Sequence, residues 1–551
     1  MKKNILYLIG IGVILILGSL INYLFVPAWN IRSAGLWFFF IIMSFFSTYL
    51  FAIIETILRK KNKEKNYIAT CLLGMLFAIL IITFITCSIT GKAIFHSSEY
   101  QQMVSFIEGN FKEDIPELTD MTTLSIVDVS TARNLGDRTI GTLKNSTWYD
   151  VDDEYNLIKY KDGYYRISAL NYGGLFKYNK AKYNGIPGYV LVNVSTQKAQ
   201  YIELDEPIKY SPSAHFSNKL KRHLRSIYPS YMFGTSFFEI DEDGIPYYIT
   251  SVKTPTIGVF GGIKEESFIL TNASTGESIE YKIADLPEWV DHAYDLEYLM
   301  KIIDDNQKYV GGFWNSLTSK TGINKTSYAY RDTGDNKNGS SYDGYNTAIT
   351  KNGEIVFYTG VTPSNGAESN IGFILANPRT GTITYYDCAG AEESSAQNSA
   401  EGLVQNLGYY ATFPTIINVD GEETYFMLLK DKAGLVQRYS LCNIKDYTKV
   451  VQAEDLETTI KLYKTKLGIS LDKKSEENLH YKEGKIENLY QAEIDGCTYY
   501  YFTFNGSSDL YISSIKNSNK QVLMKVGTEV SISYISSYEE DGVFIVKKIQ
   551  F

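Results

Sequence analysis

Two neighbouring stretches carry the strongest fold signal in this chain: FEIDEDGIPYYITSV at residues 238–252 and ILTNASTGESIEYKI at residues 269–283. In each stretch, alternating apolar and polar residues flank a short polar turn, which is the pattern of a β-hairpin. Gly244 occupies the first turn, where a tight bend requires positive φ. Asn272 opens the second, where its side chain can cap the turn. The pair therefore predicts two consecutive antiparallel hairpins.

Both hairpin types recur along the chain, alternating in the same order. The Gly-turn hairpins surround Gly163, Gly244, Gly353 and Gly421. Each is followed by an Asn-turn hairpin, at Asn193, Asn272, Asn377 and, in a looser form, Asn443. Chance explains four ordered pairs poorly, so the pattern predicts a tandem repeat.

Amphipathic stretches separate the hairpin pairs and predict helices. They cover residues 217–227, 287–306, 392–407 and 455–467; the first opens with Ser, and the second has Pro at the expected helix start. A helix beside an antiparallel sheet forms an α+β unit. We therefore predict tandem α+β units in preference to a β-propeller, whose blades have no place for long helices.

The units resemble PepSY-like domains, which pair a helix with a short antiparallel sheet and occur in tandem on exported and membrane-tethered bacterial proteins. The residues that carry the resemblance are DEDGIPYYITSV at 241–252 and LTNASTGESIEYKI at 270–283, with the Asn and Thr-Gly turn of the return strand. The resemblance covers residues 150–455 in four uneven copies. It implies restraint of a peptidase or assistance in folding, and it brings no catalytic residues.

Three apolar runs stand at the N-terminus, at residues 5–26, 36–58 and 68–89. Each is long enough to cross a hydrocarbon core of about 30 Å. A cleaved signal peptide fits less well, because the first run is too long, no small-residue cleavage site follows it, and two more runs come after it. Glu55 lies close to a boundary, so the runs predict an anchor and not a transport path.

The basic residues in the short flanks predict the orientation of these spans. One side carries Lys2, Lys3, Arg59, Lys60, Lys61, Lys63 and Lys65, and the other carries Arg32 and Lys92. We therefore predict a multi-pass protein of the bacterial cell membrane, with a cytoplasmic N-terminus and residues 92–551 outside the cytoplasm.

The C-terminal region differs from the repeats. A polar stretch after Leu467 predicts a linker, and five short strand patterns beyond it predict a small β-barrel of OB type. The predicted fold class is thus α+β, with three transmembrane helices, tandem units and a barrel. Its parts are an anchor at 1–92, a mixed segment at 93–150, units one and two at 151–305, units three and four at 306–467, and the barrel at 478–551.

Composition excludes some classes of function. A net charge of -9 argues against nucleic acid as a partner, because nucleic-acid binding requires a concentrated basic face. The 5 cysteines are widely spaced and predict no disulfide framework. The 45 tyrosines favour strands.

Motifs for catalysis or cofactor binding are absent from the sequence. It contains no HExxH, no C-x-x-C and no G-x-S-x-G that can be paired with a base, and GVFGG at 258–262 lacks the Lys of a phosphate loop. The helix between His215 and Arg225 is basic, and we interpret it as a solvated face in preference to an anion contact. The acidic loops 239–244 and 332–343 depart from a calcium loop at Thr250 and Gly334, which indicates ordinary turns. No catalytic, cofactor-binding or metal-binding residue is predicted.

These observations lead to one hypothesis and two alternatives. The hypothesis is a non-enzymatic, membrane-tethered exported protein whose partners are the lipid bilayer and another envelope protein, which it binds or restrains. The first alternative is a carboxylate-based hydrolase of cell-wall glycan, since such enzymes need only two of the 62 acidic residues across a cleft. The second is an extracytoplasmic sensor, although the predicted cytoplasmic parts are too small for a signalling domain.

Overall fold

The computed structural model describes residues 2–62, 67–118, 127–141, 146–328, 344–364, 369–468, 480–494, 497–536 and 543–551. The chain divides into two compact bodies, Met1–Tyr463 and Lys464–Phe551, which we call the sheet body and the barrel body. Each is described by itself.

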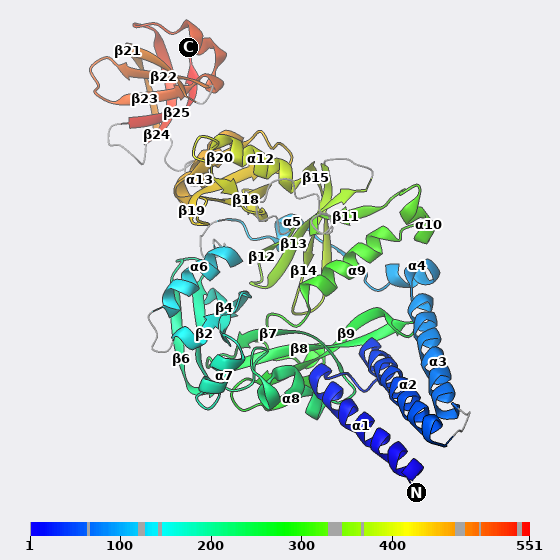
Figure 1. Cartoon of the computed structure of the whole chain (residues 1–551). Coiled ribbons are helices and arrows are strands. Elements are labelled where there is room, and N and C mark those ends of the chain that lie inside the picture. The colour runs from blue at the N-terminus through cyan, green and yellow to red at the C-terminus, as the bar shows by residue number, and fades with distance from the viewer. Residues whose placement is uncertain are drawn as a thin grey trace. The chain divides into compact units, whose positions relative to one another are not determined.

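The sheet body begins with three long helices, drawn in blue in Figure 1: α1 (Lys2–Phe25), α2 (Ala34–Asn62) and α3 (Ile68–Thr90). Their apolar parts contain 22, 26 and 23 residues. At 1.5 Å per residue the shortest is roughly 33 Å long, enough to cross a bilayer. No residue of α3 is buried in the protein, so its apolar side chains are available to lipid. The three predicted membrane helices are therefore confirmed as helices of spanning length and composition.

Four sheets follow in the described part of the sheet body, and each contains four consecutive antiparallel strands in chain order. The first has β3 (Asn156–Tyr160), β4 (Gly163–Tyr172), β5 (Ile186–Asn193) and β6 (Ala199–Ile208), with β2 (Tyr149–Val151) also on β4. The second has β7 (Met232–Ile240), β8 (Pro246–Ile257), β9 (Gly261–Asn272) and β10 (Ser278–Tyr281).

The third and fourth sheets carry additional short strands. The third has β12 (Asn346–Ile349), β13 (Ile355–Pro363), β14 (Ser369–Ala376) and β15 (Ile383–Ala391), joined by β1 (Ile107–Glu108) and β11 (Asn324–Thr326). The fourth has β17 (Thr415–Val419), β18 (Glu422–Lys430), β19 (Val436–Asn443) and β20 (Val450–Ala453), joined by β16 (Tyr410–Ala411). Every Gly-turn hairpin thus shares a sheet with the Asn-turn hairpin that follows it.

The Gly turns have the predicted backbone geometry at three of the four positions. Gly244, Gly353 and Gly421 have φ of 84°, 78° and 84°. The first turn differs, because Lys161 takes the positive φ of 53° and Gly163 is instead the first residue of β4, paired with Tyr160. The prediction of a positive φ is therefore confirmed for the later three turns.

The Asn turns are capped by the Asn side chain, as the sequence predicts. In three of them the Asn Oδ1 accepts the backbone N–H groups two and three residues ahead, at 2.8 to 3.1 Å: Asn193, Asn272 and Asn377. Asn443 accepts only the N–H of Asp446, at 2.9 Å. The looser match in the sequence corresponds to this looser cap.

Both faces of the third sheet are covered. On one face lies α9 (Leu296–Lys308), whose Leu299 and Ile303 pack against Phe357 and Ile374. On the other lies α12 (Glu393–Leu403), packed between the third and fourth sheets through Ala396 and Ala400. A strand that is buried on both faces needs apolar residues at consecutive positions, which explains the nearly continuous apolar runs of β13 and β14.

The helix predicted to begin at Pro287 was placed wrongly. The structure starts α9 at Leu296, where Asp295 caps it by accepting the N–H of Glu297 at 3.1 Å. The preceding segment covers the second sheet without forming an α-helix, and Val290 and Ala293 are in that core. The other predicted helices exist with shorter bounds: α8 (Leu220–Ile227), α12 and α13 (Leu456–Leu467).

The loop between α1 and α2, and the neighbouring ends of α2 and α3, contact the second sheet. The backbone N–H of Trp29 donates to Pro229 O at 2.9 Å, and Arg32 Nη1 donates to Pro255 O at 2.7 Å. At the tip of the β8–β9 hairpin, the ring of Phe260 lies 6.3 Å from Trp37 and 5.5 Å from Phe84. The GVFGG stretch is therefore a hairpin tip that packs on the anchor.

The barrel body contains five strands: β21 (His480–Ile494), β22 (Cys497–Phe504), β23 (Leu510–Ser514), β24 (Glu529–Ser536) and β25 (Val543–Gln550). They close in the order β21-β22-β23-β25-β24, with β23 and β25 parallel. Phe502 and Tyr511 are fully buried in its core. The predicted closed barrel is confirmed, and β21 begins close to the predicted start of the barrel at 478.

Candidate functional site

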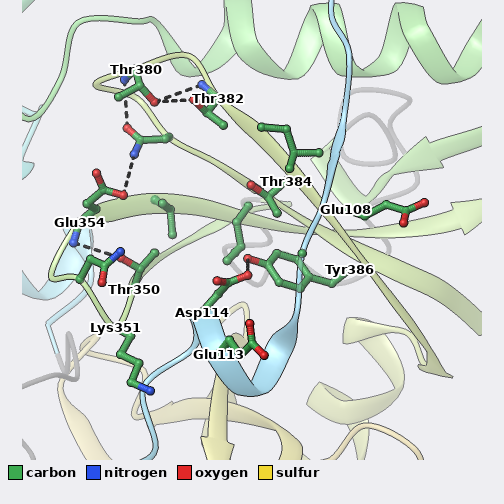
Figure 2. A pocket seen from close by; sticks show the side chains of 16 residues that line it. Glu108, Glu113, Asp114, Thr350, Lys351, Glu354, Thr380, Thr382, Thr384 and Tyr386 are labelled. Carbon is green, nitrogen blue, oxygen red and sulfur yellow. Dashed lines mark hydrogen bonds between the residues drawn. The ribbon is translucent and has the colours of Figure 1, made fainter.

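An open cleft of about 390 Å³ lies on one face of the third sheet. We call it the Asp114 cleft. Its floor is formed by side chains of β13, β14 and β15, and its wall by β1 and the short helix α5 (Phe111–Asp114) (Figure 2). This wall belongs to the segment that leads from the membrane helices to the sheets, and β1 runs parallel to β15.

Asp114 is fixed in the cleft by hydrogen bonds from both sides. Its Oδ2 accepts the Tyr386 hydroxyl at 3.0 Å and the backbone N–H of Asn110 at 3.0 Å. Its backbone carbonyl accepts the N–H of Lys351 at 2.8 Å. The carboxylate therefore joins the membrane-proximal segment to the sheet and lines the cleft at the same time.

Tyr386 is positioned by packing as well as by Asp114. Its ring is stacked on Phe373, with ring centroids 4.7 Å apart and an angle of 7° between the rings. Burial raises the pKa of Tyr386, and the hydrogen bond to Asp114 raises it further. The hydroxyl is thus a proton donor to Asp114 at neutral pH.

The other end of the cleft lies beside the Gly353 and Asn377 turns. Glu354 Oε2 accepts a hydrogen bond from Asn377 Nδ2 at 3.4 Å, and the hydroxyls of Thr380 and Thr382 are 2.9 Å apart (Figure 2). Glu354, Thr380 and Thr382 are polar and exposed to solvent. They can bind a ligand through hydrogen bonds.

The charged residues of the described lining are mostly acidic. The lining contains four carboxylates, Glu108, Glu113, Asp114 and Glu354, and one ammonium group, that of Lys351. Glu108 and Glu113 are exposed. Carboxylates gathered at one opening attract cations from solution. The arrangement therefore fits a ligand with positively charged groups, bound by charge and hydrogen bonds.

No known protein family matches this chain, and no curated protein matches it. The functional conclusions below therefore rest on geometry.

The first acidic loop is used for structure. Glu239 is fully buried, and its carboxylate accepts the N–H groups of Asp291 and His292 at 2.9 and 2.7 Å. Asp241 Oδ1 accepts the N–H groups of Asp243 and Ile245, which closes the hairpin turn. These carboxylates turn toward the protein, as an ordinary turn requires. The second loop, Asp332–Asp343, lies outside the described residues.

The basic helix α8 is only partly the solvated face that its sequence indicates. Lys219 and Lys221 are exposed. The arginines, however, contact the protein: Arg222 Nη2 donates to Tyr23 O of α1 at 3.1 Å, and Arg225 Nη1 donates to Tyr231 O at 2.5 Å. Neither guanidinium is thus a free anion contact, and Arg222 is a further link to the anchor.

Sequence reasoning did not find the Asp114 cleft. Asp114 and Tyr386 are 272 residues apart, and neither belongs to a motif. The one local signal is Asn110, which caps α5 by accepting the N–H of Lys112. That signal predicts a short helix but says nothing about the sheet it meets.

Proposed function

We propose that this protein is a membrane-tethered binding protein of the bacterial envelope, that its sheet and barrel bodies lie outside the cytoplasm, and that it binds or restrains another envelope protein. The observation that supports this best is the acidic Asp114 cleft on a body that also carries three apolar helices. Hydroxyl, amide and carboxylate groups around an open cleft can form the polar contacts of a protein–protein interface.

The charge of the cleft defines the partner. We propose that the cleft receives an extended protein segment that carries lysine or arginine side chains. A pair of opposite charges near a protein surface interacts by about 4 kcal/mol at 4 Å before desolvation is counted, and salt screens this attraction. Binding should therefore weaken as ionic strength rises.

The finer structural assignments are also proposals. A relationship of the four sheets to PepSY-like units is supported by the shared order of Gly-turn and Asn-turn hairpins. OB-type architecture is supported by the closure of five strands with one parallel pair. The orientation is supported by the excess of Lys and Arg in the flanks predicted to be cytoplasmic.

Photo-crosslinking in intact cells tests the proposed function. Thr380 and Thr196 are equivalent, since each follows its turn Asn by three residues and each is exposed, but only Thr380 lines the cleft. A photo-reactive residue at Thr380 should yield a defined crosslinked protein, and one at Thr196 should not.

The crosslink should also depend on the charge of the cleft. Replacing Glu108 and Glu113 together by Gln removes two exposed carboxylates while keeping their size, and should reduce the Thr380 crosslink several-fold. Equal crosslinking from Thr380 and Thr196, or a Thr380 crosslink indifferent to the double substitution, would contradict the proposal.

A further inference from the structure

A second cavity, of about 400 Å³, lies where the first three sheets meet. We call it the Arg166 cavity. β4 contributes Arg166, β7 contributes Thr235 and Phe237, and the third sheet contributes Thr347 and Phe357. The cavity is separate from the Asp114 cleft, and the two have no lining residue in common.

Arg166 is the unusual group in this cavity, because its charge is buried and forms no ion pair with a carboxylate in the part of the chain that the structure describes. Its side chain is almost fully enclosed, with a relative exposure of 4%. Its three nitrogens donate to Val127 O at 2.9 Å, Tyr155 O at 3.2 Å and Thr347 Oγ1 at 3.1 Å. A guanidinium has five N–H groups, so two remain for another acceptor.

The carboxylate whose charge acts on Arg166, that of Asp128, is already paired with another cation. Asp128 forms an ion pair with the buried ammonium of Lys430 at 2.5 Å. The single negative charge of Asp128 therefore faces the two positive charges of Lys430 and Arg166. Within this group of three, one buried positive charge is not balanced. Buried charges are normally paired, because a charge removed from water without a partner is costly. A ligand anion would supply the missing partner, and a guanidinium binds carboxylate by two parallel hydrogen bonds.

Two other carboxylates of this cavity, those of Asp295 and Glu154, form no ion pair with another described residue. Asp295 is buried and accepts the Thr235 hydroxyl at 2.5 Å. Glu154 is exposed at the cavity, and its pKa is raised by loss of surrounding water and by the negative charges of Asp152 and Asp295. The charge of Asp295 acts on Glu154, so these two carboxylates lie within range of each other in the cavity.

The rest of the lining includes apolar side chains, among them Phe237, Leu296 and Phe357. We propose that the Arg166 cavity binds a small zwitterion, either a free amino acid or a short peptide: Arg166 binds its carboxylate, Glu154 and Asp295 bind its ammonium group, and the apolar side chains contact what lies between. This binding is independent of the partner proposed for the Asp114 cleft.

Isothermal titration of the purified full chain in detergent micelles tests this inference. The probes are alanyl-alanine, N-acetylalanyl-alanine, which lacks the ammonium group, and alanyl-alaninamide, which lacks the carboxylate, followed by the twenty free amino acids. At least one zwitterionic probe should bind. Removal of either of its charges should weaken binding at least about tenfold, as expected for a lost charge-assisted contact.

Two substitutions assign the ends of the ligand. Glu154→Gln alters an exposed side chain and should leave folding intact. It should weaken binding of the zwitterion several-fold and leave binding of the N-acetylated form unchanged. Glu277→Gln, at an exposed position outside the cavity, is the matched control and should change nothing. Arg166→Lys keeps the positive charge but loses the planar guanidinium that can bind a carboxylate by two parallel hydrogen bonds. It should therefore weaken binding of the zwitterion and leave binding of its amide unchanged.

Three results would overturn the inference. One is the absence of binding by every zwitterionic probe. Another is equal binding of the zwitterion and its N-acetylated form, which would indicate a simple anion site. The third is equal weakening of both forms by Glu154→Gln, because loss of a carboxylate that pairs with the ammonium group should not weaken the binding of an anion that lacks this group.

Discussion

Gly353 and Gly402 differ in whether their backbone conformation requires glycine. Gly353 has φ of 78° at the turn beside the Asp114 cleft, whereas Gly402 lies in α12 with no atom near the position of an added β-carbon. Gly353→Ala should lower the free energy of unfolding by about 1 kcal/mol or more, because an L-residue is strained at this φ. Gly402→Ala should raise it by up to about 1 kcal/mol. Thermal unfolding of the purified chain compares the two, and equal effects would contradict the turn assignment.

Asp304 on α9 makes stability depend on pH. Its Oδ1 accepts the hydroxyl of Thr326 at 2.9 Å, and burial raises the pKa of Asp304 to about 6. A carboxyl whose pKa is raised by folding stabilises the folded state below its unfolded pKa, near 4, and this contribution is lost as the pH rises through about 6. The full contribution is on the order of 2–3 kcal/mol.

Asp304→Asn tests this pH dependence. The variant has no titrating group at this position, so its stability should fall less between about pH 4 and pH 7 than that of the unaltered chain. Unfolding measured across this range gives the two slopes. Identical slopes would show that the Asp304 carboxyl keeps its ordinary pKa.

Residues whose roles depend on near neighbours could be predicted from the sequence. The Asn caps and three of the Gly turns are such cases, because the groups they bind lie within a few residues. Asp114, Tyr386 and Arg166 could not be predicted, because their partners come from distant parts of the chain. A lone Asp or Arg in the sequence does not indicate which distant residue it contacts in the fold.

At the scale of helices and strands, features set by neighbouring residues could be predicted, and features set by distant residues could not. Strand pairs joined by short turns follow from alternation and turn residues, and they were predicted with the correct partners. The start of α9 was not, since the apolar spacing after Pro287 serves to cover the second sheet before the helix begins. Apolar periodicity shows which residues are buried, but it does not show what they are buried against.

The β8–β9 hairpin tip provides a test at the scale of the element. Phe260 and Trp37 are in edge contact, so Phe260→Ala and Trp37→Ala should each lower the stability of the full chain. The loss of free energy of unfolding in the double variant should be smaller than the sum of the two single losses. The difference should be roughly 0.5–1.5 kcal/mol, as expected for an aromatic pair. Tyr490, exposed on the barrel, supplies the control: Tyr490→Ala with Trp37→Ala should be additive. Additivity for Phe260 as well would mean that the hairpin tip is not coupled to the anchor.

At the scale of the whole molecule, several contacts join the N-terminal apolar helices and the loop between α1 and α2 to the second sheet, so these helices are packed against the sheet body. Trp29, Arg32 and Phe260 all contribute to this interface. The three membrane helices and the closed barrel could be predicted because each has a long or regular pattern. The interface could not, because its hydrogen bonds use backbone carbonyls, which carry no sequence signal.

Residues 93–551 should nevertheless fold when produced without the membrane helices. The second sheet and the barrel have buried cores, the third and fourth sheets share one, and the first sheet also buries apolar side chains, which a region of this size can sustain. We expect a cooperative thermal transition for this fragment, at a lower temperature than for the full chain because the interface is missing. A fragment without a cooperative transition would show that the anchor is required for the fold.

The sides of the membrane on which the end of α2 and the second sheet lie test the central claim most directly. In a chain whose native cysteines have been replaced, Lys61→Cys and Thr275→Cys put a thiol at the end of α2 and at the exposed Asn272 turn. A membrane-impermeant maleimide applied to intact cells should label Thr275→Cys and should label Lys61→Cys only after the cells are opened. Labelling of Lys61→Cys in intact cells, alone or together with Thr275→Cys, would contradict a membrane-tethered protein with its sheets outside the cytoplasm.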